Sequence, residues 1–150
     1  MKIYIAGSFS NDVLKCSLLK MIRLARKNHP SAELFIPMEH KIEEDFQMPN
    51  GNWFLSNSDW ANMVFKMDLE NLVSSDMVFA MYTGHYGTTG TSWEIGFAYA
   101  QGIPIVLYIP DWTRESKFSL MILNCAKHYM DEKGNIKKIT TKWLEQFNQK

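Results

Sequence analysis

Short apolar segments alternate with segments of helical periodicity along this chain of 150 residues. Strands are expected at 2–6, 34–36, 77–81, 104–109 and, more weakly, 128–130, because short apolar runs there end at glycine, proline or polar residues. Helices are expected at 12–27, 58–74, 92–101, 118–126 and 140–147. Strands that alternate with helices build a parallel sheet with helices on both faces. The pattern therefore predicts a single three-layer α/β/α domain over residues 1–150.

Five parallel strands suit the flavodoxin-like, doubly wound order 2-1-3-4-5. Ligands of such sheets bind outside the carboxyl ends of the strands, at the switch point between the first and third strands. The loops that leave these strands cover residues 7–11 and 82–91. We therefore expect Ser8, Phe9, Thr88 and Glu94 to lie in one crevice.

The composition excludes several classes of partner. Sixteen basic and sixteen acidic residues cancel, so nothing indicates a nucleic-acid polymer or a membrane surface as partner. The first apolar run is too short for a signal peptide, and none reaches the length of a membrane span. Cys16, Cys125 and the four histidines lack metal-type spacing. We expect buried, reduced thiols in a cytoplasmic protein that carries neither a metal nor another cofactor.

Glu94 follows a loop with glycines at 84, 87 and 90, and it is expected in the first turn of the next helix. Two interpretations are open. Thr91-x-x-Glu94 matches a capping box, in which the glutamate bonds the backbone at the start of the helix. Alternatively, the positive end of the helix keeps a poorly solvated carboxylate ionised, which suits a nucleophile. The glycine spacing itself is a weak signal, since a plain turn explains it.

Asp68 and Tyr4 are the other candidates for chemistry. Asp68 shares the apolar stripe of its predicted helix with Trp60, Val64 and Leu72, where an unpaired carboxylate is costly. It is either an edge residue or a carboxyl that points into the crevice. Tyr4, in the first strand, is either a core residue or a hydrogen-bond donor to Glu94. Two carboxyls at one site are what glycosidic bond cleavage needs.

The chain resembles the nucleoside 2-deoxyribosyltransferase family over residues 2–124. The matching segments are KIYIAGSF at 2–9, Trp60 with VFKMDL at 64–69, GTSWEIG at 90–96, GIPI at 102–105 and FSLM at 118–121. The resemblance implies that Glu94 attacks C1′ of a nucleoside sugar, that Asp68 supplies the proton for the leaving base, and that Tyr4 orients Glu94. It further implies a homo-oligomer whose site a neighbouring subunit completes.

Further residues carry roles through the same resemblance. Trp60 and Phe9 are expected to line the base pocket, and Ser8 and Gly90 to border the ligand. Ser119 and Met121 match the segment that reaches the neighbouring subunit's site.

Three positions favour a nucleotide over a free nucleoside. Many transferases have Asp at the position of Thr88 and Asn at the position of Ser119, both near the 5′ end of the sugar. A related branch that hydrolyses nucleoside 5′-monophosphates has hydroxyl residues there, which avoid repelling a phosphate. His40, where transferases often have Asn, points the same way. The sequence therefore favours a 2′-deoxynucleoside 5′-monophosphate N-glycosidase, with a base-exchanging deoxyribosyltransferase as the close alternative and a non-catalytic nucleotide-binding module as the remote one.

Overall fold

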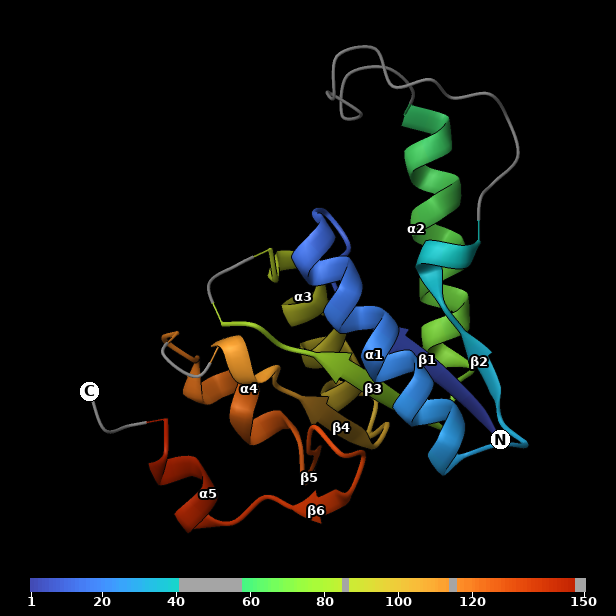
Figure 1. Ribbon diagram of the computed structural model, residues 1–150. Coiled ribbons are helices and arrows are strands. Elements are labelled where there is room, and N and C mark those ends of the chain that lie inside the picture. Colours follow the sequence, from blue (N-terminus) through green and yellow to red (C-terminus); the bar gives the residue numbers. More distant parts are fainter. Residues whose placement is uncertain (41–57, 85–86, 114–115, 148–150) are drawn as a thin grey trace.

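The structure, a computed structural model, describes residues 1–40, 58–84, 87–113 and 116–147 (Figure 1). The strands are β1 Lys2–Ala6, β2 Glu33–Phe35, β3 Met77–Met81, β4 Ile105–Tyr108, β5 His128–Met130 and β6 Ile136–Lys138. The helices are α1 Asp12–Asn28, α2 Ser58–Val73, α3 Thr89–Ala100, α4 Leu120–Cys125 and α5 Thr141–Glu145, with 3₁₀ turns η1 at Pro37–Glu39 and η4 at Asp111–Thr113. The predicted α/β alternation is confirmed.

The sheet has the order β2-β1-β3-β4-β5-β6, and its first five strands are parallel. The predicted order 2-1-3-4-5 is therefore confirmed, whereas the expectation of five strands was one short. β6 adds to β5 as an antiparallel strand. Asp131 closes the hairpin by accepting hydrogen bonds from the backbone N–H groups of Lys133 and Asn135. All three residues of β6 are exposed. The strand therefore has no alternation of buried and exposed residues that a sequence pattern could reveal.

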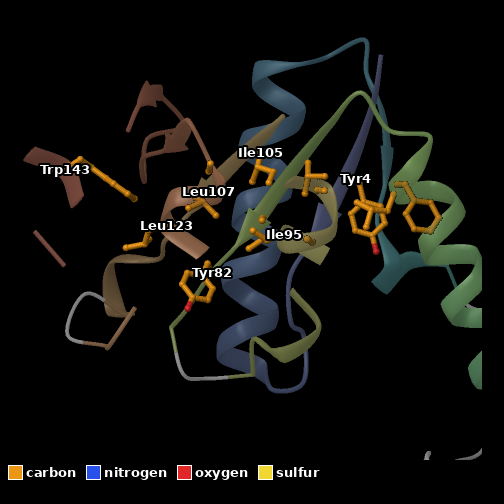
Figure 2. Close-up of a cluster of buried hydrophobic side chains, with 14 residues drawn as sticks. Tyr4, Tyr82, Ile95, Ile105, Leu107, Leu123 and Trp143 are labelled. Carbon is orange, nitrogen blue, oxygen red and sulfur yellow. The ribbon is translucent and has the colours of Figure 1, made fainter. Parts of the chain in front are cut away.

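Successive side chains of each strand point to opposite faces of the sheet, and this gives two cores. Ile3 and Ile5 face α1, where Leu14, Leu18 and Ile22 cover them. Alternate residues of the same strands pack against Ile95 and Ala98 of α3 on the other face, in the cluster that Figure 2 shows. Tyr4 belongs to this second cluster. The strand register thus directs Tyr4 to the face that α3 covers.

The capping and turn residues of the sequence predicted most helix ends to within a few residues of those in the structure. Asn11 caps α1 as expected, since its side chain accepts a hydrogen bond from the N–H of Leu14 (2.9 Å). The cysteines are a correction: both are free, but Cys16 is exposed and Cys125 is half-buried. Cys16 occupies a polar position of the amphipathic α1, so the helix turns its thiol to the surface. Among the described helices, none combines the length and the apolarity that crossing a bilayer requires.

Candidate active site

The helix that carries Glu94 starts earlier than its sequence pattern indicated. α3 begins at Thr89, so Glu94 lies in its second turn and not in the first. The predicted capping box is wrong, because Thr91 is buried inside the helix and not at its cap. The cause is Thr88, whose hydroxyl donates to the carbonyl of Gly84 (2.6 Å) and whose carbonyl accepts from Ser92 N–H (2.7 Å). This folds the loop back and begins the helix one turn sooner.

Glu94 is held by Tyr4. The hydroxyl of Tyr4 donates a hydrogen bond of 2.6 Å to Oε1 of Glu94, which is the second of the two roles considered for Tyr4 and the one that the family resemblance implies. Burial raises the pKa of Tyr4 far above its ordinary value, and the nearby charge of Glu94 adds to the rise. Tyr4 therefore stays protonated, and it remains a donor that fixes one oxygen of the carboxyl group.

Asp68 lies close enough to Tyr4 and Glu94 for its charge to act on both. Its side chain is half-buried, and its Oδ1 is buried with no hydrogen-bond partner among the described residues. Buried polar atoms are normally paired, so an unpaired one calls for an explanation. A bound ligand that donates a hydrogen bond provides one. The structure thus brings together Tyr4, Asp68 and Glu94 from β1, α2 and α3.

Both carboxyl groups hold protons more tightly than in water. Burial raises the pKa of Glu94 to about 7, the Tyr4 hydrogen bond works against the rise, and the charge of Asp68 adds to it. Burial likewise raises the pKa of Asp68 to about 6, while the positive charge of His40 works against it. Interacting groups of this kind titrate as a pair. Near neutral pH the pair can therefore hold one proton and one negative charge. Because the pKa of Glu94 is the higher of the two, the proton lies mainly on Glu94 in the ligand-free protein, and it must pass to Asp68 on substrate binding for the two groups to act as nucleophile and acid.

The loops after β1 and β3 meet, as their places at the switch point predicted. A Cβ placed on Gly87 would lie 3.1 Å from Oγ of Ser8, and the φ of Gly87 is +62°. Glycine is favoured there by both conformation and space. Gly90, in the first turn of α3, would have no atom within 4 Å of a Cβ added to it, so its surroundings are open to a ligand. Phe9 is 47% exposed at the same edge.

The remaining predicted site residues differ in how the described contacts connect them to this centre. His40 stacks on Phe35, with ring centroids 4.4 Å apart. Trp60 is half-buried in the first turn of α2, whose amino-terminal half extends beyond the sheet (Figure 1). Ser119 precedes α4 and donates its N–H to the hydroxyl of Tyr82 (3.2 Å), while Met121 is 80% exposed. Neither Ser119 nor Met121 has a described contact with Tyr4, Asp68 or Glu94.

Two residues that support the site were missed by sequence reasoning. Phe35 contacts the rings of both Tyr4 and His40, and Tyr82 holds the segment before α4. Their roles depend on which strands and loops become neighbours, and no local pattern carries that information. Two cavities of about 580 and 540 Å³ beside α5 and the β5–β6 hairpin contain none of the predicted site residues. In the part of the chain that the structure describes, no group of three His, Cys, Asp or Glu side chains could hold a metal ion.

The family model for nucleoside 2-deoxyribosyltransferases matches residues 3–138. The chain belongs to this family. A nucleoside deoxyribosyltransferase of Lactobacillus johnsonii is 25% identical to this deoxyribosyltransferase-family protein over 87 residues, which are 58% of this chain and 58% of that one. The chain thus spans less than two thirds of that curated relative.

Solved structures show the same fold. A 2-deoxyribosyltransferase of Bacillus psychrosaccharolyticus is 26% identical to this family member, with a TM-score of 0.74 over 93% of this chain and 100% of that one. A CMP N-glycosidase of Clostridium botulinum shares the fold at 16% identity, with a TM-score of 0.54 over 89% of this chain and 93% of that one. The predicted resemblance and the predicted fold class are both confirmed.

The raised pKa of Glu94 makes the stability of the folded protein depend on pH. A carboxyl whose pKa rises from 4.5 to about 7 on folding contributes stability below pH 4.5 that is lost as the pH rises through 7. Glu94→Gln cannot ionise. We expect its free energy of unfolding at pH 8 to exceed that of the parent by roughly 3 kcal/mol, and the two to be equal at pH 4. Urea unfolding at both pH values measures this, with the exposed Glu70→Gln as control. Equal stability of Glu94→Gln and the parent at pH 8 would show that Glu94 ionises freely.

Proposed function

We propose that this protein cleaves the N-glycosidic bond of 2′-deoxyribonucleosides, with Glu94 as the nucleophile. The observation that carries the proposal is a half-buried carboxyl group that a phenol hydroxyl fixes through one oxygen, beside a second carboxyl at the switch point of the sheet. This leaves Oε2 of Glu94 to attack C1′. The family to which the chain belongs, and relatives named as deoxyribosyltransferases, support the same chemistry.

In the first step Oε2 of Glu94 forms a bond to C1′ while the bond from C1′ to the base nitrogen breaks. The electron pair of the broken bond goes to the base, and Asp68 gives it a proton. The product is a deoxyribosyl ester of Glu94. In the second step an acceptor attacks C1′ from the face that the base left, its proton goes to Asp68, and Glu94 is released as a carboxylate. Two displacements return the sugar to its original anomeric configuration.

The leading acceptor is a second base, which makes the reaction a deoxyribosyl transfer. The transferase relatives support this choice, and so does the position of the Thr88 hydroxyl. Its proton is donated inward to Gly84, so Thr88 has no donor to offer to a phosphate in this arrangement. The support that a nucleotide substrate drew from a hydroxyl donor at Thr88 is thereby lost.

Hydrolysis of 2′-deoxynucleoside 5′-monophosphates is the second candidate, because the absence of a negative charge at positions 88 and 119 still favours it. Thr88 and Ser119 are uncharged, so neither repels a phosphate. The shared fold of the CMP N-glycosidase is compatible with either substrate.

We further propose that a second copy of the chain completes the site. Large apolar side chains are exposed on α2, α3 and the start of α4, namely Met63, Phe65, Trp93, Tyr99, Leu120 and Met121. Exposed apolar patches of this kind mark interaction surfaces. Ser119 and Met121 lie on this surface, from which they can reach the site of a neighbouring subunit.

Chromatography of reaction mixtures tests the proposal. The protein is incubated with each deoxynucleoside plus a second free base, and separately with each deoxynucleoside 5′-monophosphate alone. We expect exchanged nucleosides in the first set. Free base released from monophosphates without an acceptor would instead establish the second candidate, and no product in either set would overturn the proposed function.

Thr88→Asp separates the two candidates further. A carboxylate at this position is expected to lower kcat/KM for a 5′-monophosphate by about 10-fold or more relative to kcat/KM for the free nucleoside, because only the phosphate is repelled, whereas loss of the hydroxyl that donates to Gly84 affects both substrates alike. Thr88→Asn is the matched control, because asparagine has the shape of aspartate without its charge. Equal losses on both substrates would remove Thr88 from the neighbourhood of the 5′ end.

A further inference from the structure

The aromatic ring of Phe35 lies beside that of Tyr4 because of the strand register. Tyr4 of β1 pairs directly with Phe35 of β2 in the parallel ladder. Directly paired residues point to the same face of a sheet. The two rings accordingly stack with centroids 5.5 Å apart and planes 25° apart, and both side chains are buried. A shift of the Phe35 ring therefore displaces the ring of Tyr4, whose hydroxyl holds Glu94.

The chain then turns sharply and brings His40 onto the same phenylalanine. The 3₁₀ turn η1 is closed by the hydrogen bonds from Glu39 N–H to Ile36 carbonyl (2.9 Å) and from His40 N–H to Pro37 carbonyl (3.2 Å). Its Glu39 pairs with Arg26 of α1 (3.6 Å). The rings of His40 and Phe35 are nearly parallel, with planes 10° apart and centroids 4.4 Å apart. An otherwise exposed imidazole is thus held in one orientation.

Tyr4 and His40 each act on one of the two carboxyl groups. Tyr4 donates its hydrogen bond to Glu94. His40 lies close enough to Asp68 for its positive charge to favour the ionised form of that carboxyl. Phe35 touches neither carboxyl group in any described contact, yet it contacts both of the rings that influence them.

We propose that Phe35 is a positioning residue, which holds the rings of Tyr4 and His40 and through them sets Glu94 and Asp68 relative to each other. The catalytic consequence of this role rests on the proposed function, whereas its effect on the carboxyl groups rests on the two ring contacts, on the Tyr4–Glu94 hydrogen bond and on the nearness of His40 to Asp68. Small displacements of reacting groups lower rates strongly, so a residue remote from the substrate can matter for turnover.

The test compares Phe35→Leu with Phe79→Leu. Phe79 is also buried in a strand of the sheet, but it packs in the core on the α1 side. Phe79→Leu therefore makes the same substitution at a buried position away from the site. The titrations of Asp68 and Glu94 are followed by carboxyl NMR. In Phe35→Leu we expect both to move to higher pH, because Glu94 loses a well-aligned donor and Asp68 loses the charge of His40. The four titratable groups that the described contacts place here are Tyr4, His40, Asp68 and Glu94.

Turnover of a deoxynucleoside with a second base is measured on the same variants. Phe35→Leu is expected to lower kcat by about 10-fold with KM changed by no more than about twofold, because the ring orders the reacting groups and not the substrate. Phe35→Tyr keeps the ring and is expected to restore kcat and both titrations. If Phe35→Leu does not fold, Phe35→Met, which fills the space without a flat ring, takes its place.

Several results would overturn the inference. Carboxyl titrations that stay in place or move to lower pH in Phe35→Leu would show that the ring only excludes water. A loss of kcat as large in Phe79→Leu as in Phe35→Leu would reduce the effect to general destabilisation. A parent protein without turnover would refute the proposed function, whereas the titrations would still decide whether Phe35 positions the two carboxyl groups.

Discussion

Glu94→Ala is expected to lower deoxyribosyl transfer by at least about 1,000-fold while the protein stays folded. The proposed reaction has no substitute for a nucleophile that Tyr4 holds at 2.6 Å. The fold does not depend on the charge, because burial destabilises the ionised form of Glu94. Initial rates of base exchange measure the loss, and circular dichroism shows whether the variant is folded.

Adding small external nucleophiles to Glu94→Ala tests the covalent mechanism directly. The space left by the side chain in Glu94→Ala can admit azide or formate, which attacks C1′ in place of the carboxylate. A single displacement then yields a product of inverted anomeric configuration, in contrast to the two displacements of the parent. Glu70→Gln, an exposed position on α2, serves as the control for a lost carboxylate. Parent-like exchange by Glu94→Ala would eliminate the covalent mechanism altogether.

Asp68→Asn is expected to give the second largest loss, about 100-fold or more for natural bases. The amide has nearly the shape of the carboxyl group but cannot give a proton to the departing base. The loss should shrink for bases that leave easily, because such bases need little protonation in the transition state. Rates on a series of deoxynucleosides with bases of different basicity measure this dependence.

The substrate binding of Asp68→Asn is expected to change much less than its rate. Single-turnover kinetics separate the two, since they report base release directly. A uniform loss across the whole series of bases, or a raised KM with an unchanged rate, would assign Asp68 to binding and leave the source of the proton open.

The site shows where sequence reasoning succeeds and where it stops. Tyr4, Asp68 and Glu94 were selected as candidates from their places on predicted elements, and the structure brings the three together. The start of α3 was misplaced because Thr91-x-x-Glu94 has the pattern of a capping box. The helix begins earlier because of the hydrogen bond from Thr88 to Gly84, which this sequence pattern does not reveal.

Local sequence was enough to predict the α/β alternation, the order of the parallel strands and the placement of Glu94 on a helix after a glycine loop. These features follow from local periodicity, turn residues and the handedness of strand connections. Other features became visible only in the folded chain: Phe35 contacts the rings of both Tyr4 and His40, and Oδ1 of Asp68 is left unpaired among the described residues. They depend on the register of strands and on the packing of distant helices, which are set by the whole folded chain and not by any one segment of it.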